Sequence, residues 1–394
     1  MVNKVLLKDI ATITTGSTAP KDKYFSNNGL PFIRAGHLET LIDKNNINEL
    51  PKIDDETGKQ LKLKKVNKGT ILFAKSGMSS TKNRVYICTE DAYIVNHLAA
   101  IIPDSRFIDN YFLKFFLEWF KPSRLIIDES YPSIRTADIG NIEIQLPSLE
   151  NQMKIVKILN KAKLLIKTRK AQIEALDQLT QSVFLEMFGD IRINSKKYKQ
   201  VKLNEVITKI TTGKSLAGEG ISEYKVLKTS AVSYKFFKQN EVKYLPQDYV
   251  PPVSHIVNKG DVLVSRMNTS ELVGAAAYVF DEIKNIALPD RIWKLHYSRK
   301  INPIFLWYFI NQSYFRDKVT DIATGTSGSM KNISQKKYLN LSILLPDISL
   351  QNKFAEFVYK IQIEKDKMDK GLIELNNIFN SLMQHTFNGK LFPE

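Results

Sequence analysis

Two similar stretches, "LPSLENQMKIVKIL" at 146–159 and "LPDISLQNKFAEFV" at 345–358, each mark an abrupt change of sequence pattern. Before each Leu-Pro pair, apolar and polar residues alternate with the period of two that is typical of a β-strand. After it, apolar residues recur every three or four positions, as on one face of an α-helix. Each stretch therefore predicts that a strand-rich domain ends and a long helix begins, with Ser148 and Asp347 as N-caps and Gly189 ending the first helix.

The two predicted helices share one heptad pattern, in which core positions are spaced alternately by four and three residues. Every core position of the second helix lies the same 199 residues after its counterpart in the first. The positions are Ile155, Leu159, Ala162, Ile166, Arg169, Ile173, Leu176, Thr180 and Val183 in the first helix, and Phe354, Val358, Ile361, Lys365, Met368, Leu372, Leu375, Phe379 and Leu382 in the second. Such a strict repeat favours an antiparallel coiled coil within the chain. The alternative is two amphipathic helices that each pack only on their own domain.

Arg169 and Lys365 occupy core positions of this pattern, where a polar residue costs stability but selects the register. In the simplest antiparallel register, Arg169 faces Met368 and Lys365 faces Ile173. We expect both charged side chains to extend along the apolar surface to the edge of the helix pair.

Further matches in the same order indicate that the whole chain is an internal duplication. "TITTGST" at 12–18 corresponds to "KITTGKS" at 209–215, and "VNKGTILFAKSG" at 66–77 corresponds to "VNKGDVLVSRMN" at 257–268. The Gly-Lys-Ser ending of the second copy resembles a phosphate-binding loop, but that loop requires a glycine five positions before its Gly-Lys pair. Thr208 stands there, so the duplication is the better interpretation.

The domains that precede the helices contain short β-like runs separated by turn residues, and each has one aromatic-rich helical stretch. We expect these stretches, 108–120 and 302–315, to be core and not base-stacking platforms. Strands with a helix in each unit, but without a regular βαβ series, predict an α+β fold. The predicted organisation is a first domain at 1–146, a first spacer helix at 147–189, a linker at 190–200, a second domain at 201–345 and a second spacer helix at 346–394.

The 394-residue chain carries a net charge of +16, which favours a polyanionic partner such as nucleic acid. An acidic protein or an anionic membrane surface would also suit this charge. The single cysteine, Cys88, excludes an internal disulfide, and the scattered histidines provide no zinc-binding spacing. No apolar run reaches the length of a membrane span and no secretory signal is recognised, so we expect no membrane association and a cytoplasmic location.

Loops that follow the matching motifs differ between the two halves and contain the candidate DNA contacts. Arg can bind guanine and Asn can bind adenine with two hydrogen bonds, whereas Lys and Ser mostly contact phosphate. The candidates are Lys75, Ser76, Lys82, Arg84 and Arg135 in the first domain and Lys214, Arg266, Asn268, Arg291 and Lys331 in the second. His97, the counterpart of Arg291, is expected to be a core histidine. Different loops predict different half-sites, although the alternative for any single candidate is a solvated surface side chain.

Each domain opens with a similar run, "LKDIATITTG" at 7–16 and "LNEVITKITTG" at 203–213, and closes in Leu-Pro followed by a long helix. In this duplicated order the chain resembles the specificity subunits of type I restriction-modification systems, over essentially its whole length. One departure is Ser349, which replaces the acidic residue that Glu150 supplies in the first copy.

The resemblance implies a non-catalytic subunit that binds double-stranded DNA and docks two adenine-N6 methyltransferase subunits, with restriction-translocase subunits joining through them. S-adenosylmethionine is then expected on the methyltransferase, and no cofactor or metal on this chain. The chain itself lacks the amino-methyltransferase tetrapeptide, since "NPIF" at 302–305 has Ile where the second proline must stand. The alternative is a basic coiled-coil adaptor that reads no DNA sequence.

Overall fold

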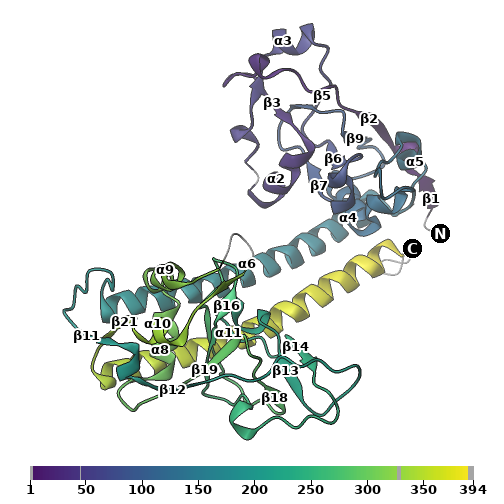
Figure 1. The fold of residues 1–394 in the computed structure, drawn as a ribbon. Helices are drawn as coiled ribbons and strands as arrows, with labels where there is room; N and C mark the ends of the chain where they lie inside the picture. Colours follow the sequence, from purple (N-terminus) through teal and green to yellow (C-terminus); the bar gives the residue numbers. More distant parts are fainter. Residues whose placement is uncertain (1–2, 45, 326–329, 389–394) are drawn as a thin grey trace. The chain divides into compact units, whose positions relative to one another are not determined.

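A computed structural model describes residues 3–44, 46–325 and 330–388 (Figure 1). The chain divides into two compact units, one formed by Met1–Ala171 with Asp369–Glu394 and the other by Gln172–Met368. Each unit therefore combines one strand-rich domain with a piece of each long helix. Among the described residues, no helix has the length and apolar character needed to cross a bilayer.

The two long helices are α6 (Leu149–Phe188) and α11 (Ile348–Phe387), each of 40 residues. They begin directly after the predicted caps Ser148 and Asp347, whose carbonyl oxygens accept the first helical hydrogen bonds, from the Gln152 and Gln351 backbone N–H groups. Gly189 follows α6 with a φ of 71°, the left-handed conformation that a glycine allows at a helix end. Both helices thus begin where predicted, and the first also ends where predicted, whereas α11 ends at Phe387 and the predicted end at Glu394 lies outside the described residues.

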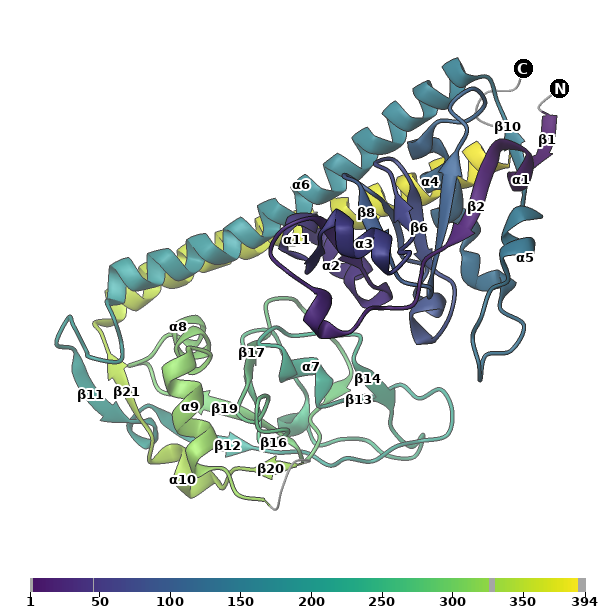
Figure 2. The same ribbon diagram turned by 90° about the horizontal axis from the view of Figure 1, so that it is seen from above.

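Within each unit the two helices run antiparallel, as Figures 1 and 2 show. In the first unit one apolar cluster joins the start of α6 to the end of α11 through Ile155, Leu159, Met383 and Phe387. In the second unit another cluster joins the end of α6 to the start of α11 through Phe184, Phe188, Phe354 and Val358. All the predicted heptad positions are buried or half-buried, so the face that packs is the one with the heptad pattern.

Lys365 differs from its prediction, because it does not extend to the edge of the helix pair. Its side chain is only 10% exposed, and its ammonium group forms an ion pair with Asp177 of α6. The ammonium also lies 4.7 Å from the centre of the Phe236 ring. The low exposure of the charge is therefore compensated by a carboxylate and an aromatic face.

Arg169 reaches across to a glycine of α11. A Cβ atom at Gly371 would lie 2.6 Å from Nη1 of Arg169, closer than real Cβ contacts allow. The missing side chain thus makes room for the guanidinium at this position of the helix pair.

A buried glutamine in the first turn of each long helix attaches the helix to its domain. The Gln152 side chain is completely buried, and its Oε1 accepts a hydrogen bond from the Asp109 N–H at 2.8 Å. Its Nε2 donates to the carbonyl oxygens of Phe107 and Pro147, both at 2.9 Å. One side chain thus satisfies three backbone groups from two segments.

Gln351 repeats this arrangement in the second unit. It is also completely buried, and its Oε1 accepts a hydrogen bond from the Asn302 N–H at 2.9 Å. Its Nε2 donates to the carbonyl oxygens of Lys300 at 3.3 Å and Pro346 at 2.8 Å. Asp109 and Asn302 are in turn the N-caps of the helices α4 (Asn110–Phe120) and α8 (Pro303–Ile310). The same amide therefore orients two helices in each unit.

The first domain is built on a four-stranded antiparallel sheet. Its strands are, in spatial order, β2 (Ala11–Thr15), β9 (Leu98–Pro103), β6 (Ile71–Ala74) and β7 (Val85–Ile87). A second sheet has the order β4 (Lys52–Ile53), β3 (Leu30–Ile33), β8 (Ala92–Ile94) and β5 (Lys65–Val66), and β1 (Asn3–Leu6) pairs with β10 (Glu143–Leu146). Short helices α1 (Leu7–Ile10), α2 (Leu38–Lys44), α3 (Asp55–Gln60) and α5 (Thr136–Gly140) connect them.

The second domain repeats this plan. Its main sheet has the order β12 (Ile207–Thr211), β19 (Ile292–Tyr297), β15 (Val262–Ser265) and β17 (Ala276–Tyr278). Beside it lie β14 (Val242–Tyr244), β13 (Lys225–Leu227) and β18 (Ile286–Ala287), and two pairs, β11 (Lys199–Lys202) with β21 (Ser342–Leu345) and β16 (Met267–Asn268) with β20 (Lys331–Asn332). Its other helices are α7 (Ser230–Ser233), α9 (Ser313–Ile322) and α10 (Gln335–Leu339). The predicted α+β class is confirmed.

The main sheets are buried on both faces, which explains their continuous apolar runs. In β6, Ile71 and Phe73 belong to the cluster shared with α4 and the long helices, whereas Leu72 and Ala74 belong to the cluster beneath the second sheet. Successive side chains of a strand point to opposite faces, so each run serves two cores.

The aromatic-rich stretches are core, as expected. Phe112 and Phe116 of α4 pack on Phe387 of α11, with ring centroids 5.4 and 5.6 Å apart. The predicted single helix at 302–315 is wrong in its length, because α8 ends at Ile310 and α9 begins at Ser313. The Asn311 side chain turns back to Ala276, accepting its N–H and donating to its carbonyl oxygen, and so fixes this break.

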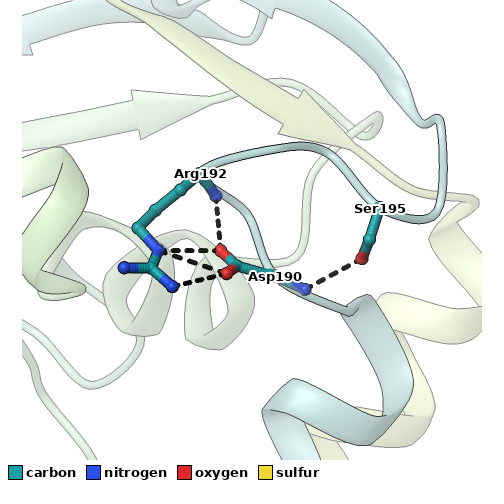
Figure 3. A network of polar contacts seen from close by, with 3 residues as sticks. All are labelled: Asp190, Arg192 and Ser195. Atoms are coloured by element: carbon teal, nitrogen blue, oxygen red, sulfur yellow. Dashed lines mark hydrogen bonds and ion pairs between the residues drawn. The ribbon is translucent and has the colours of Figure 1, made fainter.

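The segment after α6 is a folded loop, although its sequence shows no apolar period. The Asp190 carboxylate accepts hydrogen bonds from the backbone and guanidinium of Arg192, and the Asp190 N–H donates to Ser195 Oγ at 3.0 Å (Figure 3). These hydrogen bonds from Arg192 lower the pKa of Asp190. Ile191, which follows Asp190, joins the apolar core of the second unit.

The glycines of the two "ITTG" motifs are needed for close packing. A Cβ atom at Gly16 would lie 2.1 Å from the Ile94 carbonyl oxygen, and one at Gly213 would lie 1.8 Å from that of Leu288. In both domains the end of the first sheet strand thus crosses directly over the backbone of another segment. The repeated motif is explained by packing, in agreement with the rejection of a phosphate-binding loop.

We predict that Gln152→Leu or Gln351→Leu lowers the free energy of unfolding by roughly 2–5 kcal/mol, because each leaves three backbone groups without their partner. Urea unfolding followed by circular dichroism measures this loss. Lys157→Leu, at an exposed position of α6, is the matched control and should change stability by less than about 0.5 kcal/mol. An equal effect of all three variants would contradict the anchoring role.

Candidate functional site

Three loop segments of the first domain are tied together by backbone hydrogen bonds at one edge of the main sheet. The Lys75 N–H, just after β6, donates to the His97 carbonyl oxygen at 2.9 Å. The Ile134 N–H donates to the Lys75 carbonyl oxygen at 2.7 Å, and Ser76 forms an isolated antiparallel bridge with Ser133. We call this arrangement the first junction.

The second domain has the same junction, built by the corresponding residues. The Arg266 N–H, just after β15, donates to the Arg291 carbonyl oxygen at 3.0 Å. The Ile333 N–H donates to the Arg266 carbonyl oxygen at 3.0 Å, and β16 pairs with β20 beside it. The duplication therefore extends from the sequence motifs to individual hydrogen bonds, while the side chains on this frame differ.

The first junction brings together three of the predicted candidates. Lys75 and Ser76 are half-buried, and Arg135 is exposed. Lys82 is exposed in the loop between β6 and β7. Arg84 forms an ion pair with Glu39 at 2.6 Å. A contact of Arg84 with DNA would have to replace this internal partner.

The second junction also brings candidates together, and their side chains differ in exposure and in hydrogen bonds within the domain. Arg291 is exposed, and Lys331 is half-buried with its ammonium donating to the Gly325 carbonyl oxygen at 3.2 Å. The Nε of half-buried Arg266 is enclosed and has no hydrogen-bond partner among the described residues. These cationic groups come from three separate loops, which the junction collects.

Asn268 is the candidate with the most internal hydrogen bonds. Its Nδ2 donates to Ser233 Oγ at 2.9 Å and to Ser265 Oγ at 3.2 Å, and its Oδ1 accepts the Thr269 N–H at 2.9 Å. Both the nitrogen and the oxygen of its side-chain amide thus form hydrogen bonds within the domain. Binding of adenine would first require these hydrogen bonds to break, which favours a structural role at this position.

Lys214 is exposed, with its ammonium 5.9 Å from the centre of the Tyr249 ring. The next residue, Ser215, forms a hydrogen bond with the Asp290 carboxylate, directly before Arg291 in the chain. The loop that carries Lys214 is therefore tied to the loop that carries Arg291.

The expectation of a core position for His97 is wrong. The side chain is exposed, and its Nδ1 lies 2.7 Å from Ser76 Oγ in a hydrogen bond. The apolar run that suggested burial begins only at Leu98, which is fully buried in β9. The chain turns from an exposed to a buried position within one residue, and the pattern of the run did not reveal this.

Two basic residues that the sequence analysis did not select follow parallel strands. β3 runs parallel to β8, and Arg34 follows β3 with an exposed side chain; in the second domain β13 runs parallel to β18, and exposed Lys228 follows β13. Parallel strands end at the same edge of their sheet, so Arg34 lies at the edge where β8 ends and Lys228 at the edge where β18 ends. The sequence signal that could have identified Arg34 and Lys228 is a basic residue directly after an apolar strand run in both halves.

The Arg34 backbone is held by a histidine. Its N–H donates to Nδ1 of His37 at 3.2 Å, which requires a neutral nitrogen. Burial and the nearby charge of Arg34 lower the pKa of His37 from its ordinary value. The neutral imidazole is thus favoured in the folded domain.

Comparison with known proteins shows what this chain is similar to. The model described as the type I restriction modification DNA specificity domain matches residues 2–175. The EcoKI specificity subunit of Escherichia coli is 23% identical over 98% of this chain and 89% of its own length. The MjaVIII specificity subunit of Methanocaldococcus jannaschii is 29% identical over 62% of this chain and 61% of its own length. The chain is thus similar to the specificity subunits of type I restriction-modification systems.

Solved structures agree on the fold. The crystal structure of an S subunit from M. genitalium covers all of this chain and is itself covered to 96%, with a TM-score of 0.59 at 15% identity. A second chain, from a study of complex assembly and conformational transition of the type I R-M system, gives a TM-score of 0.54 at 16% identity over 99% of this chain and 98% of its own length. Both structures thus share the fold described above.

We predict that the free energy of unfolding decreases as the pH falls from 7.5 to 5, in part through His37. A histidine with a lowered folded pKa contributes stability that is present above its unfolded value of about 6.5 and is lost as the pH falls through the folded value. Thermal unfolding across this range should show a smaller pH dependence for His37→Gln than for the unmodified chain. His385→Gln, at an exposed position of α11, is the control and should behave like the unmodified chain.

Proposed function

We propose that this chain is a specificity subunit that binds double-stranded DNA at an asymmetric, two-part target and reads one half-site with each junction. The observation that carries the proposal is the pair of equivalent junctions, which have the same backbone hydrogen bonds but different side chains at their edges. Because the two junctions have the same backbone arrangement, they would present their side chains to DNA in the same way. Because the side chains differ, they would select different bases. The net charge of +16 supports the binding of phosphate.

The long helices, in this proposal, hold the two domains apart as a spacer and dock two methyltransferase subunits. Large apolar side chains remain exposed on both helices, outside the face with the heptad pattern. They include Met153, Leu164, Leu165 and Leu185 of α6 and Ile373 and Ile378 of α11, with exposed fractions between 48% and 62%. These exposed apolar side chains support the proposal that the helices bind partner subunits.

The catalytic groups would come from these partners. S-adenosylmethionine would bind the methyltransferase, which modifies adenine N6, and restriction-translocase subunits would join through it. This chain would contribute target choice and spacing without catalysis, in the cytoplasm where the DNA is. The Gln152 and Gln351 anchors support this division, because they couple each domain rigidly to the helices on which the partners would lie.

The rival function is a basic coiled-coil adaptor that reads no sequence. Matching hydrogen bonds at both junctions favour the specificity subunit, because an adaptor has no need for two equivalent loop frames with unlike side chains. Exchange of residues 201–345 for the second domain of a relative distinguishes the two. A specificity subunit would then recognise a target with one half changed and the other kept.

The first prediction from this proposal concerns DNA methylation in the source cell. Deletion of the gene should abolish adenine methylation at one two-part motif with a fixed gap, because no other subunit selects that sequence. A long-read methylation map with and without the gene measures this, and reintroduction of the gene should restore the motif. An unchanged map in cells that express the assembled complex would refute the proposal.

The second prediction concerns the salt dependence of DNA binding. Lys214→Ala should weaken binding to all sequences alike and lower the slope of log K against log salt by about one, because one phosphate contact is lost. Titrations of the assembled complex between low and moderate salt measure the slope. Lys4→Ala is the control, since this exposed lysine is paired with Glu143 at 3.5 Å and the slope should stay unchanged.

A further inference from the structure

His97 is placed and oriented by the fold more firmly than an ordinary exposed side chain. Its carbonyl oxygen accepts the Lys75 N–H, and the next residue, Leu98, begins a central strand. Its ring is held at Nδ1 by the Ser76 hydroxyl at 2.7 Å. The backbone and one side of the imidazole are therefore fixed, and Nε2 has no partner among the described residues.

Arg291 occupies the same place in the second domain. Its carbonyl oxygen accepts the Arg266 N–H, as that of His97 accepts the Lys75 N–H, and Ile292 begins the corresponding strand β19. Its side chain is exposed and has no ion-pair partner in the part of the chain that the structure describes. One position of the duplicated frame thus carries imidazole in one domain and guanidinium in the other.

These two groups read bases by different hydrogen bonds. Guanidinium can donate two parallel hydrogen bonds to O6 and N7 of guanine. An imidazole offers a single nitrogen, and its role depends on Ser76: if the hydroxyl donates to Nδ1, Nε2 carries the proton and donates, and if the hydroxyl accepts, Nε2 is an acceptor. Both forms suit a base edge in the major groove, where donors and acceptors differ from base to base.

We propose that His97 and Arg291 are equivalent base-reading residues, each determining one base pair of its own half-site, and that Ser76 positions the His97 ring. This inference rests on the proposed function. A preorganised ring loses little side-chain entropy on binding, which is why the Ser76 hydrogen bond matters for discrimination.

The test uses the complete complex in the source cell, with the altered gene as its only copy, and maps methylated adenines. His97→Ala should relax the motif at one base pair, with about a five- to tenfold loss of discrimination there, the range expected for one direct base contact. The other half-site should stay unchanged and so report that the chain folds and assembles. Arg291→Ala should relax one base pair of that other half.

Three further variants separate base reading from positioning. Ser76→Ala should relax the same base pair as His97→Ala but to a smaller extent, and Ser76→Thr, which keeps the hydroxyl, should restore it. His97→Arg should shift the preference at that pair toward guanine, because it places the chemistry of Arg291 on the equivalent frame.

The outcomes are distinguishable from a failure of the proposed function. If deletion of the gene changes no motif, the proposed function fails. If deletion abolishes a motif but His97→Ala leaves it intact, the base-reading role of His97 is refuted. A uniform loss of methylation at all sites of the unaltered motif would also refute it, since this indicates a phosphate contact.

Discussion

The side-chain amide of one buried glutamine in each unit is the interaction on which the remaining structure depends. Gln152 and Gln351 each satisfy three backbone groups that would otherwise be buried without a partner. An unsatisfied buried group costs roughly 1–3 kcal/mol, so the helix start is held against its domain in one orientation. The long helix can then transmit the position of its domain, which a flexible linker could not do.

The two halves of the duplication share these backbone contacts, whereas many of their side chains differ. The junctions keep the same backbone hydrogen bonds, because these connect main-chain groups and are indifferent to side-chain identity. The helix pair shows divergence as well. Buried Lys365 forms an ion pair with exposed Asp177 in the second unit, and their counterparts in the first unit are Ile166 and Asn376. An ion pair present in only one half makes the two halves of the helix pair unequal, which favours the observed pairing of α6 with α11.

Much of the fold could be predicted from the sequence for a physical reason. A heptad repeat and its 199-residue offset are periodic over many residues, so the signal accumulates, and the boundaries at 148 and 347 are marked by a change of period. Local exceptions were missed. The helix break at Asn311 depends on side-chain hydrogen bonds to Ala276, and the burial of Lys365 depends on the position of Asp177, neither of which a single segment reveals.

The candidate site, like the fold, could be predicted from the sequence in part. Most of the predicted candidates lie in loops that differ between the matching motifs, and the structure brings six of them to the two junctions: Lys75, Ser76, Arg135, Arg266, Arg291 and Lys331. The sequence by itself determined the duplication, the helix pair and the basic loops, since periodicity, motif order and charge are properties of the chain. Only the tertiary structure decided that His97 is exposed beside Ser76, that the Asn268 amide is already hydrogen-bonded, and that Arg34 and Lys228 lie at edges where parallel strands end. Those facts depend on hydrogen bonds and strand ends contributed by segments far apart in the sequence, and they exist only once the sheets have formed.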